Sequence, residues 1–361
     1  MMLDFYKGKR VLITGHTGFK GSWLSKILVM AGADVHGYAL PQPEDNESLY
    51  KIADIENIMD SHLGDIRNYD ELKEYFDKVK PEIVFHLAAQ PIVRDSYKDP
   101  RYTYETNVMG TVNICECVRL SDSVKSFLNV TTDKVYQNNE WEWGYREDEK
   151  LDGFDPYSNS KSCSELVTHS YINSFLNEMS IATSTARAGN VIGGGDFAND
   201  RLIPDCVRAT MKGEKIILRN PDSTRPFQHV LEALSAYLLL AQMQYEDKAY
   251  AGYYNVGPNE GDAVTAGKLA GSYSDAWNSL ITTGEKSCKY NNKLEIEVRP
   301  DGGPHEANYL KLDCSKIKSR LKWSPKWNID DAVRATAEWT YAYFSGEGIA
   351  SMEKQIKEYF Q

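Results

Sequence analysis

The sequence has no apolar run long enough to span a bilayer, and its first ten residues, MMLDFYKGKR, contain no apolar signal core. Its six cysteines form no C-x-x-C pair and no Cys/His cluster with zinc spacing. We therefore expect reduced thiols, no bound metal, and a soluble protein of the cytoplasm.

An excess of positive charge is also missing. The 361 residues include 41 Lys and Arg against 52 Asp and Glu, which gives a formal net charge of −11. This balance argues against a surface that binds nucleic acid or an anionic membrane. Charged residues make up 26% of the chain and aromatic residues 11%, which is an ordinary globular composition, with no repeat or low-complexity tract.

Apolar runs and helix-like stretches alternate through the first half of the chain. The strand-like runs, such as residues 10–15 and 126–132, are mostly apolar along their length, as in a parallel sheet that is covered on both faces. The pattern predicts an α/β fold with a Rossmann-type doubly wound parallel sheet over residues 1–190. Most of residues 191–361 are expected to form a smaller mixed α/β substrate domain, while a helix and strand around 226–258 pack back on the first domain.

The stretch TGHTGFKG places Gly15, Gly18 and Gly21 between the first strand and the first helix. Glycine lets the backbone approach a pyrophosphate closely, and the N-terminus of the helix favours its negative charge. The spacing G-x-x-G-x-x-G is one residue longer than the dehydrogenase fingerprint G-x-G-x-x-G. Its place at the first strand-to-helix junction nevertheless predicts a dinucleotide site.

The end of the second strand leaves the choice between NAD and NADP open. An Asp or Glu is expected there for a ribose hydroxyl, but HGYALPQPEDN has no acid before Glu44 and Asp45 and no Arg for a 2′-phosphate. Asp65 is a plausible partner for the adenine amine, and a helix cap is an equally weighted alternative for it.

Five polar side chains are expected at the carboxyl edge of the sheet, where open parallel sheets bind ligands. DPYSNSKS puts Tyr157 and Lys161 one helical turn apart, on one face of a helix. A neighbouring ammonium favours the phenolate and is expected to lower the pKa of Tyr157, which would make it a base for a sugar hydroxyl. The strand FLNVTT delivers Thr132, Asp133 and Lys134 to the same edge. This convergence predicts acid–base chemistry rather than a solvated turn.

These motifs, together with HLAAQP, RAGNVIGGGDFANDRLIPD and RPFQHVLEALSAYLLLA, resemble the extended short-chain dehydrogenase/reductases over nearly the whole chain. Within that group they resemble the CDP-glucose 4,6-dehydratase family, because the dTDP-glucose relatives are expected to carry Glu at the position of Lys134. The resemblance implies an NAD-dependent hydro-lyase that converts CDP-D-glucose to CDP-4-dehydro-6-deoxy-D-glucose, for deoxysugar and lipopolysaccharide O-antigen biosynthesis. It implies hydride transfer from C4 to NAD, loss of water across C5 and C6, and return of the hydride to C6. A homodimer or homotetramer is also implied.

The resemblance further implies roles for single residues. The residues implied to be catalytic are Thr132, Asp133, Lys134, Tyr157 and Lys161. Cofactor contacts are implied for the last two and for Gly15, Thr17, Gly18, Phe19, Gly21, Asp65, Ile66, Leu87, Ala88 and Ala89. Substrate contacts are implied for Gln90, Asn190, Arg201, Arg225 and Arg299. Trp141 and Trp143 are equally compatible with shaping a substrate lid and with packing.

Three alternative functions remain open. A sugar-nucleotide 4-epimerase would share the fold and the Tyr/Lys pair, although Asp133 and Lys134 argue against it. A dehydratase of another NDP-sugar would share every motif, because no residue identifies the nucleotide base. A non-catalytic NAD-sensing regulator would need no Tyr/Lys pair. The residues also leave open whether Lys134 or another group removes the C5 proton.

Overall fold

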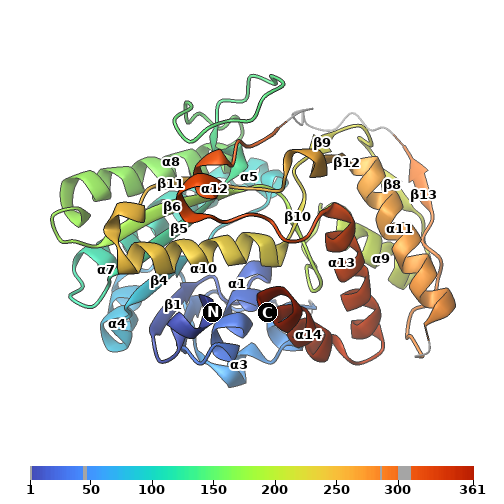
Figure 1. Cartoon of the computed structure of the whole chain (residues 1–361), viewed down its shortest axis with the longest axis horizontal. Coiled ribbons are helices and arrows are strands. Elements are labelled where there is room, and N and C mark those ends of the chain that lie inside the picture. The colour runs from blue at the N-terminus through green and yellow to red at the C-terminus, as the bar shows by residue number, and fades with distance from the viewer. Residues whose placement is uncertain (1, 44–46, 285–286, 300–309) are drawn as a thin grey trace.

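A computed structural model of the chain describes residues 2–43, 47–284, 287–299 and 310–361. The acids that follow the second strand, Glu44 and Asp45, lie outside these ranges. Seven strands form one parallel sheet in the order β11-β6-β5-β4-β1-β2-β3 (Figure 1), which confirms the expected doubly wound α/β fold. In that order the strands are β11 (Tyr253–Val256), β6 (Ala182–Ala188), β5 (Ser126–Thr132), β4 (Ile83–His86), β1 (Arg10–Thr14), β2 (Asp34–Ala39) and β3 (Asp60–Leu63).

The central strands are apolar throughout because helices cover both faces of the sheet. On β1, Val11 and Ile13 pack with α1 and α10, whereas Leu12 packs on the opposite face with α4 and α7. Successive side chains of a strand point to opposite faces, so a run without polar residues satisfies both layers. The helices of the two layers are α1 (Phe19–Met30) and α10 (Val230–Glu246) on one side, and α4 (Tyr69–Val79), α7 (Gly110–Arg119) and α8 (Pro156–Tyr171) on the other.

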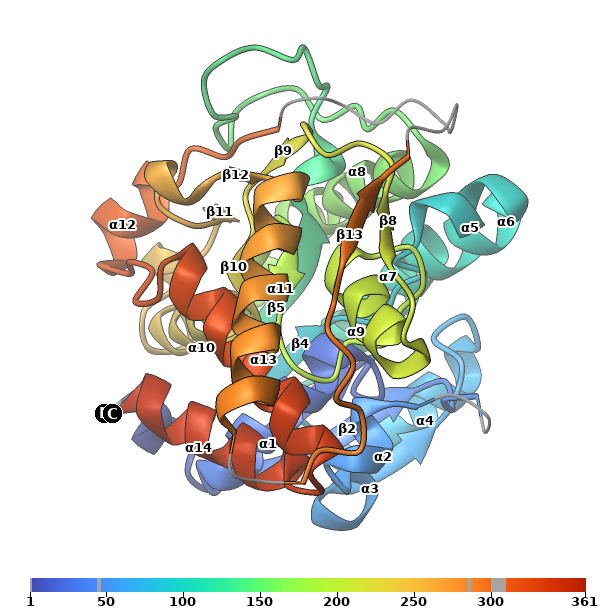
Figure 2. The same cartoon turned by 90° about the vertical axis from the view of Figure 1, so that its right-hand side faces the viewer.

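A second apolar cluster, which includes the fully buried Trp277, is formed by helices beside the sheet. Figure 2 shows these helices facing the viewer. The helices of the cluster are α9 (Leu202–Lys212), α11 (Ala266–Thr283) and α13 (Ile329–Phe344). The two-stranded pairs are β7 (Val191–Ile192) with β10 (Gln228–His229), β9 (Thr224–Arg225) with β12 (Val264–Thr265), and β8 (Ile216–Leu218) with β13 (Ile296–Val298). Between these elements the chain returns to the main sheet, where β11 pairs with β6 and α10 covers one face.

The remaining elements, all short except α14, complete the fold. They are α2 (Leu49–Ile52), α3 (Ile55–Ile58), α5 (Val93–Lys98), α6 (Pro100–Tyr104), α12 (Ser315–Leu321) and α14 (Gly348–Phe360), with single turns η1 (Met2–Tyr6), η2 (Glu105–Met109), η3 (Asp133–Val135), η4 (Ile172–Leu176), η5 (Lys248–Tyr250) and η6 (Glu260–Asp262). Among the described residues, no helix combines the length and the apolar character that crossing a membrane requires.

Candidate active site

The glycine turn between β1 and α1 fits a bound dinucleotide. Gly15 has φ +80°, and a Cβ there would stand 2.7 Å from the backbone nitrogen of Ala88. A Cβ on Gly21 would stand 2.1 Å from the Gly15 carbonyl oxygen. At Gly18, the N-cap of α1, the nearest such atom is 3.4 Å away, so this side of the turn has room for a closely approaching group. A diphosphate placed there would meet the backbone N–H groups at the start of α1.

The other expected cofactor residues surround this turn. Thr17 Oγ1 donates to the carbonyl of Leu40 just after β2 (2.9 Å), and Ala88 N donates to Thr14 Oγ1 (3.2 Å). These bonds fix the turn to the ends of β2 and β4. At the same edge lie Phe19 at the start of α1 and Leu87, Ala88 and Ala89 directly after β4.

Asp65 and Ile66 follow β3. Asp65 Oδ2 lies 2.6 Å from Arg67 Nη2, and hydrogen bonding to Arg67 holds the pKa of this carboxyl below its usual range. Ile66 is buried in the cluster of α4 and α7. The alternative assignment of Asp65 as a helix cap is wrong, because Asn68 caps α4.

Three polar residues meet where β5 ends. Thr132 is the last residue of β5, and its Oγ1 donates to Asp133 Oδ1 at 3.0 Å and accepts from Lys134 N at 3.4 Å. Asp133 is 1% exposed, and its Oδ2 has no hydrogen-bond partner. Burial raises the pKa of Asp133 above its usual value, although Lys134 and Thr132 oppose this. The carboxyl is therefore biased toward the protonated form that a proton donor needs.

The Tyr157–Lys161 pair lies at the start of α8, next to these residues. Lys161 Nζ donates to the carbonyl of Val130 at 3.2 Å, and Tyr157 is hydrogen-bonded to Thr132. Burial lowers the pKa of Lys161 to about 8. Burial raises the pKa of Tyr157 to about 12, and its bond to Thr132 opposes the change only in part. The sequence predicted a lowered pKa for Tyr157, but desolvation is the dominant effect and the pKa is raised.

Two residues in this cluster carried no expectation from the sequence. Lys20, in the first turn of α1, has its Nζ 6.0 Å from the ring centroid of Tyr237 on α10. Burial lowers the pKa of Lys20 to about 8, helped by the charges of Arg201 and Lys161. Tyr237 Oη is buried without a hydrogen-bond partner. Lys20 stands inside the motif TGHTGFKG, whereas Tyr237 lies in an amphipathic helical stretch in which no pattern distinguishes it.

Three of the expected substrate residues, Asn190, Arg201 and Arg225, lie in the loops and short strands that follow β6. Arg201 pairs with the buried Asp196 at 2.9 Å, and its charge lowers the pKa of Tyr157 in opposition to burial. Arg225 on β9 is buried, and its charge lowers the pKa of Asp133 in opposition to burial. Asn190 connects β6 to β7, where its carbonyl accepts from Gln228 N. Arg201 and Arg225 are therefore brought to the site.

Two further expected substrate residues make local contacts. Gln90 Nε2 donates to Thr103 Oγ1 at 2.9 Å and its Oε1 accepts from Ile92 N, so both ends of the buried amide hold the loop after β4. Arg299 is exposed and its guanidinium is paired with Glu297. The structure thus assigns these two side chains to local contacts.

The tryptophans expected to form a lid or to pack lie in the segment after η3. The ring of Trp141 lies 5.2 Å from that of Tyr145, while Trp143 is 67% exposed. Trp141 thus has a packing contact, and Trp143 leaves an aromatic surface open to a ligand.

Comparisons with known proteins show the family to which the chain belongs. A family profile described as GDP-mannose 4,6 dehydratase matches residues 12–336. The chain is 45% identical to a CDP-glucose 4,6-dehydratase of Salmonella typhimurium over 99% of its own length and 97% of that protein. It is 27% identical to a dTDP-glucose 4,6-dehydratase of Shigella flexneri, covering 92% of this chain and 93% of the other.

Solved structures share the fold. A dTDP-glucose 4,6-dehydratase from Bacillus anthracis in complex with NAD matches with a TM-score of 0.72 at 20% identity, covering 92% of this chain and 96% of that one. A UDP-glucose-4-epimerase from Stenotrophomonas maltophila with bound NAD gives 0.77 at 19% identity, with coverages of 93% and 98%. The profile match and the full-length 45% identity show that the chain belongs to the GDP-mannose 4,6 dehydratase family, alongside the CDP-glucose 4,6-dehydratase.

Proposed function

We propose that the protein dehydrates CDP-D-glucose to CDP-4-dehydro-6-deoxy-D-glucose for deoxysugar biosynthesis. The observation that carries this proposal is that Thr132 contacts both Tyr157 and the buried Asp133 carboxyl, whose Oδ2 has no hydrogen-bond partner. A 4-epimerase has no need for an acid that is biased toward protonation. The full-length similarity to a CDP-glucose 4,6-dehydratase supports CDP-glucose as the substrate.

We infer that NAD occupies the glycine turn and is regenerated at each turnover. The open side of the turn at Gly18 fits a diphosphate, and residues 40–43 after β2 contain no arginine that would receive the 2′-phosphate of NADP. When bound, NAD supplies the acceptor for the hydride of sugar C4 and the donor that returns it to C6.

The residues of the chain supply the proton transfers. Tyr157 accepts the proton of the 4-hydroxyl, and the charge of Lys161 stabilises the phenolate that receives it. The C4 ketone acidifies the C5 proton, which Lys134 removes and later returns to C5. Asp133 protonates the C6 hydroxyl as it leaves as water. The proton gained by Tyr157 balances the proton lost by Asp133 in each turnover.

We further propose that Asn190, Arg201 and Arg225 hold the diphosphate of the substrate. The two guanidinium groups are the residue type best suited to a phosphate, and both lie near the reacting groups. On this assignment most of residues 191–361 act as the nucleotide-sugar domain and residues 1–190 as the NAD domain.

The assembly and location are proposals as well. Exposed apolar side chains lie on η2, directly after α7 and on α8, namely Met109 at 51%, Leu120 at 49% and Leu166 at 53% exposure, which supports a homodimer or homotetramer through this helical face. The six free thiols suit the reducing cytoplasm. Light scattering on the purified protein would measure the number of subunits.

Incubation with CDP-, dTDP-, GDP- and UDP-hexoses, followed by mass spectrometry of the sugar nucleotide, tests the activity. We expect CDP-glucose alone to lose one water. Loss of water from another NDP-hexose would correct the substrate, and an epimerised product of unchanged mass would refute dehydration.

A further inference from the structure

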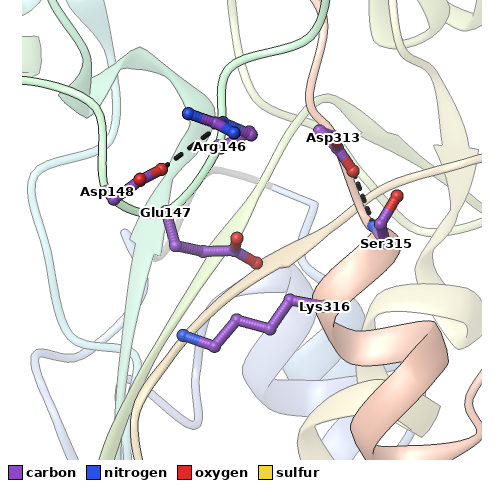
Figure 3. A pocket seen from close by; sticks show the side chains of 6 residues that line it. All are labelled: Arg146, Glu147, Asp148, Asp313, Ser315 and Lys316. Atoms are coloured by element: carbon purple, nitrogen blue, oxygen red, sulfur yellow. Dashed lines mark hydrogen bonds and ion pairs between the residues drawn. The ribbon is translucent and has the colours of Figure 1, made fainter.

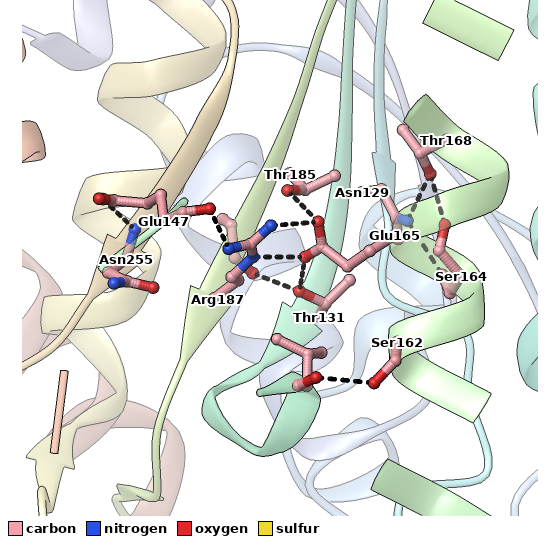
Figure 4. Close-up of polar contacts among 12 residues, drawn as sticks. Asn129, Thr131, Glu147, Ser162, Ser164, Glu165, Thr168, Thr185, Arg187 and Asn255 are labelled. Atoms are coloured by element: carbon pink, nitrogen blue, oxygen red, sulfur yellow. Dashed lines mark hydrogen bonds and ion pairs between the residues drawn. The ribbon is translucent and has the colours of Figure 1, made fainter. Parts of the chain in front are cut away.

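A buried ion pair stands directly behind the Tyr157–Lys161 pair. Glu165 and Arg187 are 1% and 2% exposed, and two contacts of 3.0 Å join them, Nε to Oε1 and Nη2 to Oε2. Glu165 also accepts hydrogen bonds from Thr131 and Thr185 (Figure 4). Two charges so far from water persist only when their remaining hydrogen-bonding capacity is satisfied, and this carboxylate has four donors.

Glu165 holds α8 against the end of β5. It follows Lys161 by one helical turn, so it shares a face of α8 with Lys161 and Tyr157. Lys161 is bonded to Val130 on β5, and Glu165 is bonded to the next residue, Thr131. These two consecutive contacts come immediately before Thr132. The position of α8 along β5 is therefore fixed where the reacting groups lie.

Arg187 extends the same network to the segment 136–147. Its Nη1 donates to Tyr136 Oη at 2.8 Å and to the Glu147 carbonyl at 3.0 Å. Tyr136 Oη donates to Asn255 Oδ1 at 2.6 Å, and Glu147 Oε1 accepts from Asn255 N at 2.9 Å. Both ends of the segment that follows Asp133 and Lys134 are thus bonded to one guanidinium.

The outer side of this segment faces a small pocket. Arg146, Glu147 and Asp148 line it together with Asp313, Ser315 and Lys316, and it encloses about 260 Å³ (Figure 3). Glu147 thus lines the pocket while its backbone carbonyl accepts from Arg187. Tyr145 attaches the same segment to residues 311–313 through backbone hydrogen bonds, and Arg187 is the contact that links it to α8 through Glu165.

We propose, on the basis of the function proposed above, that Glu165 and Arg187 are positioning residues: Glu165 keeps Lys161 charged, and Arg187 couples the segment 136–147 to the catalytic helix. Besides Glu165, the groups that face Lys161 are Tyr157 on α8, His86 on β4 and Lys20 on α1. Glu165 is the anion that raises the pKa of Lys161, against the dominant effect of burial. His86 is neutral, because burial lowers its pKa to about 3, and Lys20 opposes the positive charge.

The variant Glu165→Gln tests whether Glu165 keeps Lys161 charged. We expect the alkaline limb of the pH profile of kcat/KM to move to lower pH by ~1 unit, because Lys161 then loses its proton more readily. Glu165→Asp keeps the negative charge, so the alkaline limb should stay at its wild-type pH. Glu116→Gln, which removes a carboxylate from the partly exposed pair with Arg119 on α7, is the matched control and should leave the limb in place.

A second pair of measurements separates positioning from folding. Glu165→Gln leaves Arg187 buried without its counter-charge, so the double variant with Arg187→Met should recover Tm while keeping the shifted limb. Arg187→Met should also speed proteolytic cleavage within 136–147. An unshifted limb in both Glu165→Gln backgrounds would overturn the assignment of Glu165, and unchanged cleavage would overturn that of Arg187.

Titration of Lys161 by NMR of ¹³C-labelled lysine requires no turnover. A wild-type protein that dehydrates no hexose but shows the Glu165-dependent shift would refute only the proposed function. An active wild-type protein with no shift would refute only the inference.

Discussion

The ammonium of Lys161 donates a hydrogen bond to the carbonyl of Val130, two residues before Thr132, with Nζ and O 3.2 Å apart. The side chain that supports the tyrosine is therefore attached to the strand that carries the acid. Together with the bond from Thr131 to Glu165, this contact fixes the distance between the proposed base for the 4-hydroxyl and the groups proposed to act on C5 and C6. Substitutions at Tyr157 should therefore impair the oxidation of C4, whereas substitutions at Asp133 or Lys134 should impair the loss of water.

Tyr157→Phe should reduce turnover by roughly 10²- to 10⁴-fold, because it removes the group that accepts the 4-hydroxyl proton. Binding of the nucleotide sugar should survive, since the diphosphate supplies most of the affinity. Turnover and calorimetric Kd should be measured on the same preparation. Near-normal turnover would exclude Tyr157 from the mechanism.

Asp133→Asn and Lys134→Ala should oxidise C4 but stop before water is lost. A 4-keto-hexose that keeps its 6-hydroxyl should accumulate, together with the near-ultraviolet absorbance of the reduced cofactor. With wild-type protein and substrate deuterated at C4, the label should appear at C6 of the product. Dehydration at the wild-type rate in both variants would make the two residues structural.

Activity should fall as the pH rises through about 8, because the pKa of Lys161 is lowered to about 8 and the phenolate of Tyr157 then loses its stabilising cation. The deprotonated lysine is the inactive form, so the loss is on the alkaline side. The pKa of Lys20 is also lowered to about 8, so the profile of Lys20→Met serves as the control. Disappearance of the alkaline limb in that variant would assign it to Lys20.

Gly21→Ala and Gly18→Ala should differ in what they damage. The Cβ of the first would stand 2.1 Å from the Gly15 carbonyl oxygen, so we expect a loss of ~1–3 kcal/mol in stability and a lower Tm. The second meets no atom closer than 3.4 Å, so it should fold normally but bind NAD on the order of tenfold more weakly, which is about 1.4 kcal/mol. Equal NAD affinity in Gly18→Ala and wild type would place the diphosphate elsewhere.

Local spacing made the glycine turn, the Tyr157–Lys161 pair and the end of β5 predictable. Each depends on a few consecutive residues and on the rule that parallel strands share a carboxyl edge. The Glu165–Arg187 pair was not predictable, because α8 and β6 meet only in the folded chain. The pKa of Tyr157 was expected in the wrong direction for a related reason: burial is a tertiary property, and it outweighs the neighbouring charge.

The local partners of Gln90 and Arg299 show another limit of the sequence. A resemblance transfers a residue type to a position, but it does not reveal which neighbours already occupy the side chain. For Gln90 these are Thr103 and the backbone of Ile92, and for Arg299 the partner is Glu297. None of these three partners belongs to a motif.

The return of the chain to the main sheet at β11 limits how such proteins can recombine. A fragment that ends near residue 190 would leave the outer edge of β6 unpaired and the face beneath α10 bare, because both are covered by residues 230–256. An exposed strand edge beside an uncovered apolar face favours aggregation. A gene fusion that exchanges the proposed nucleotide-sugar portion between relatives must therefore keep α10 and β11 with the sheet they complete, which requires three crossovers, near residues 190, 229 and 256, rather than one.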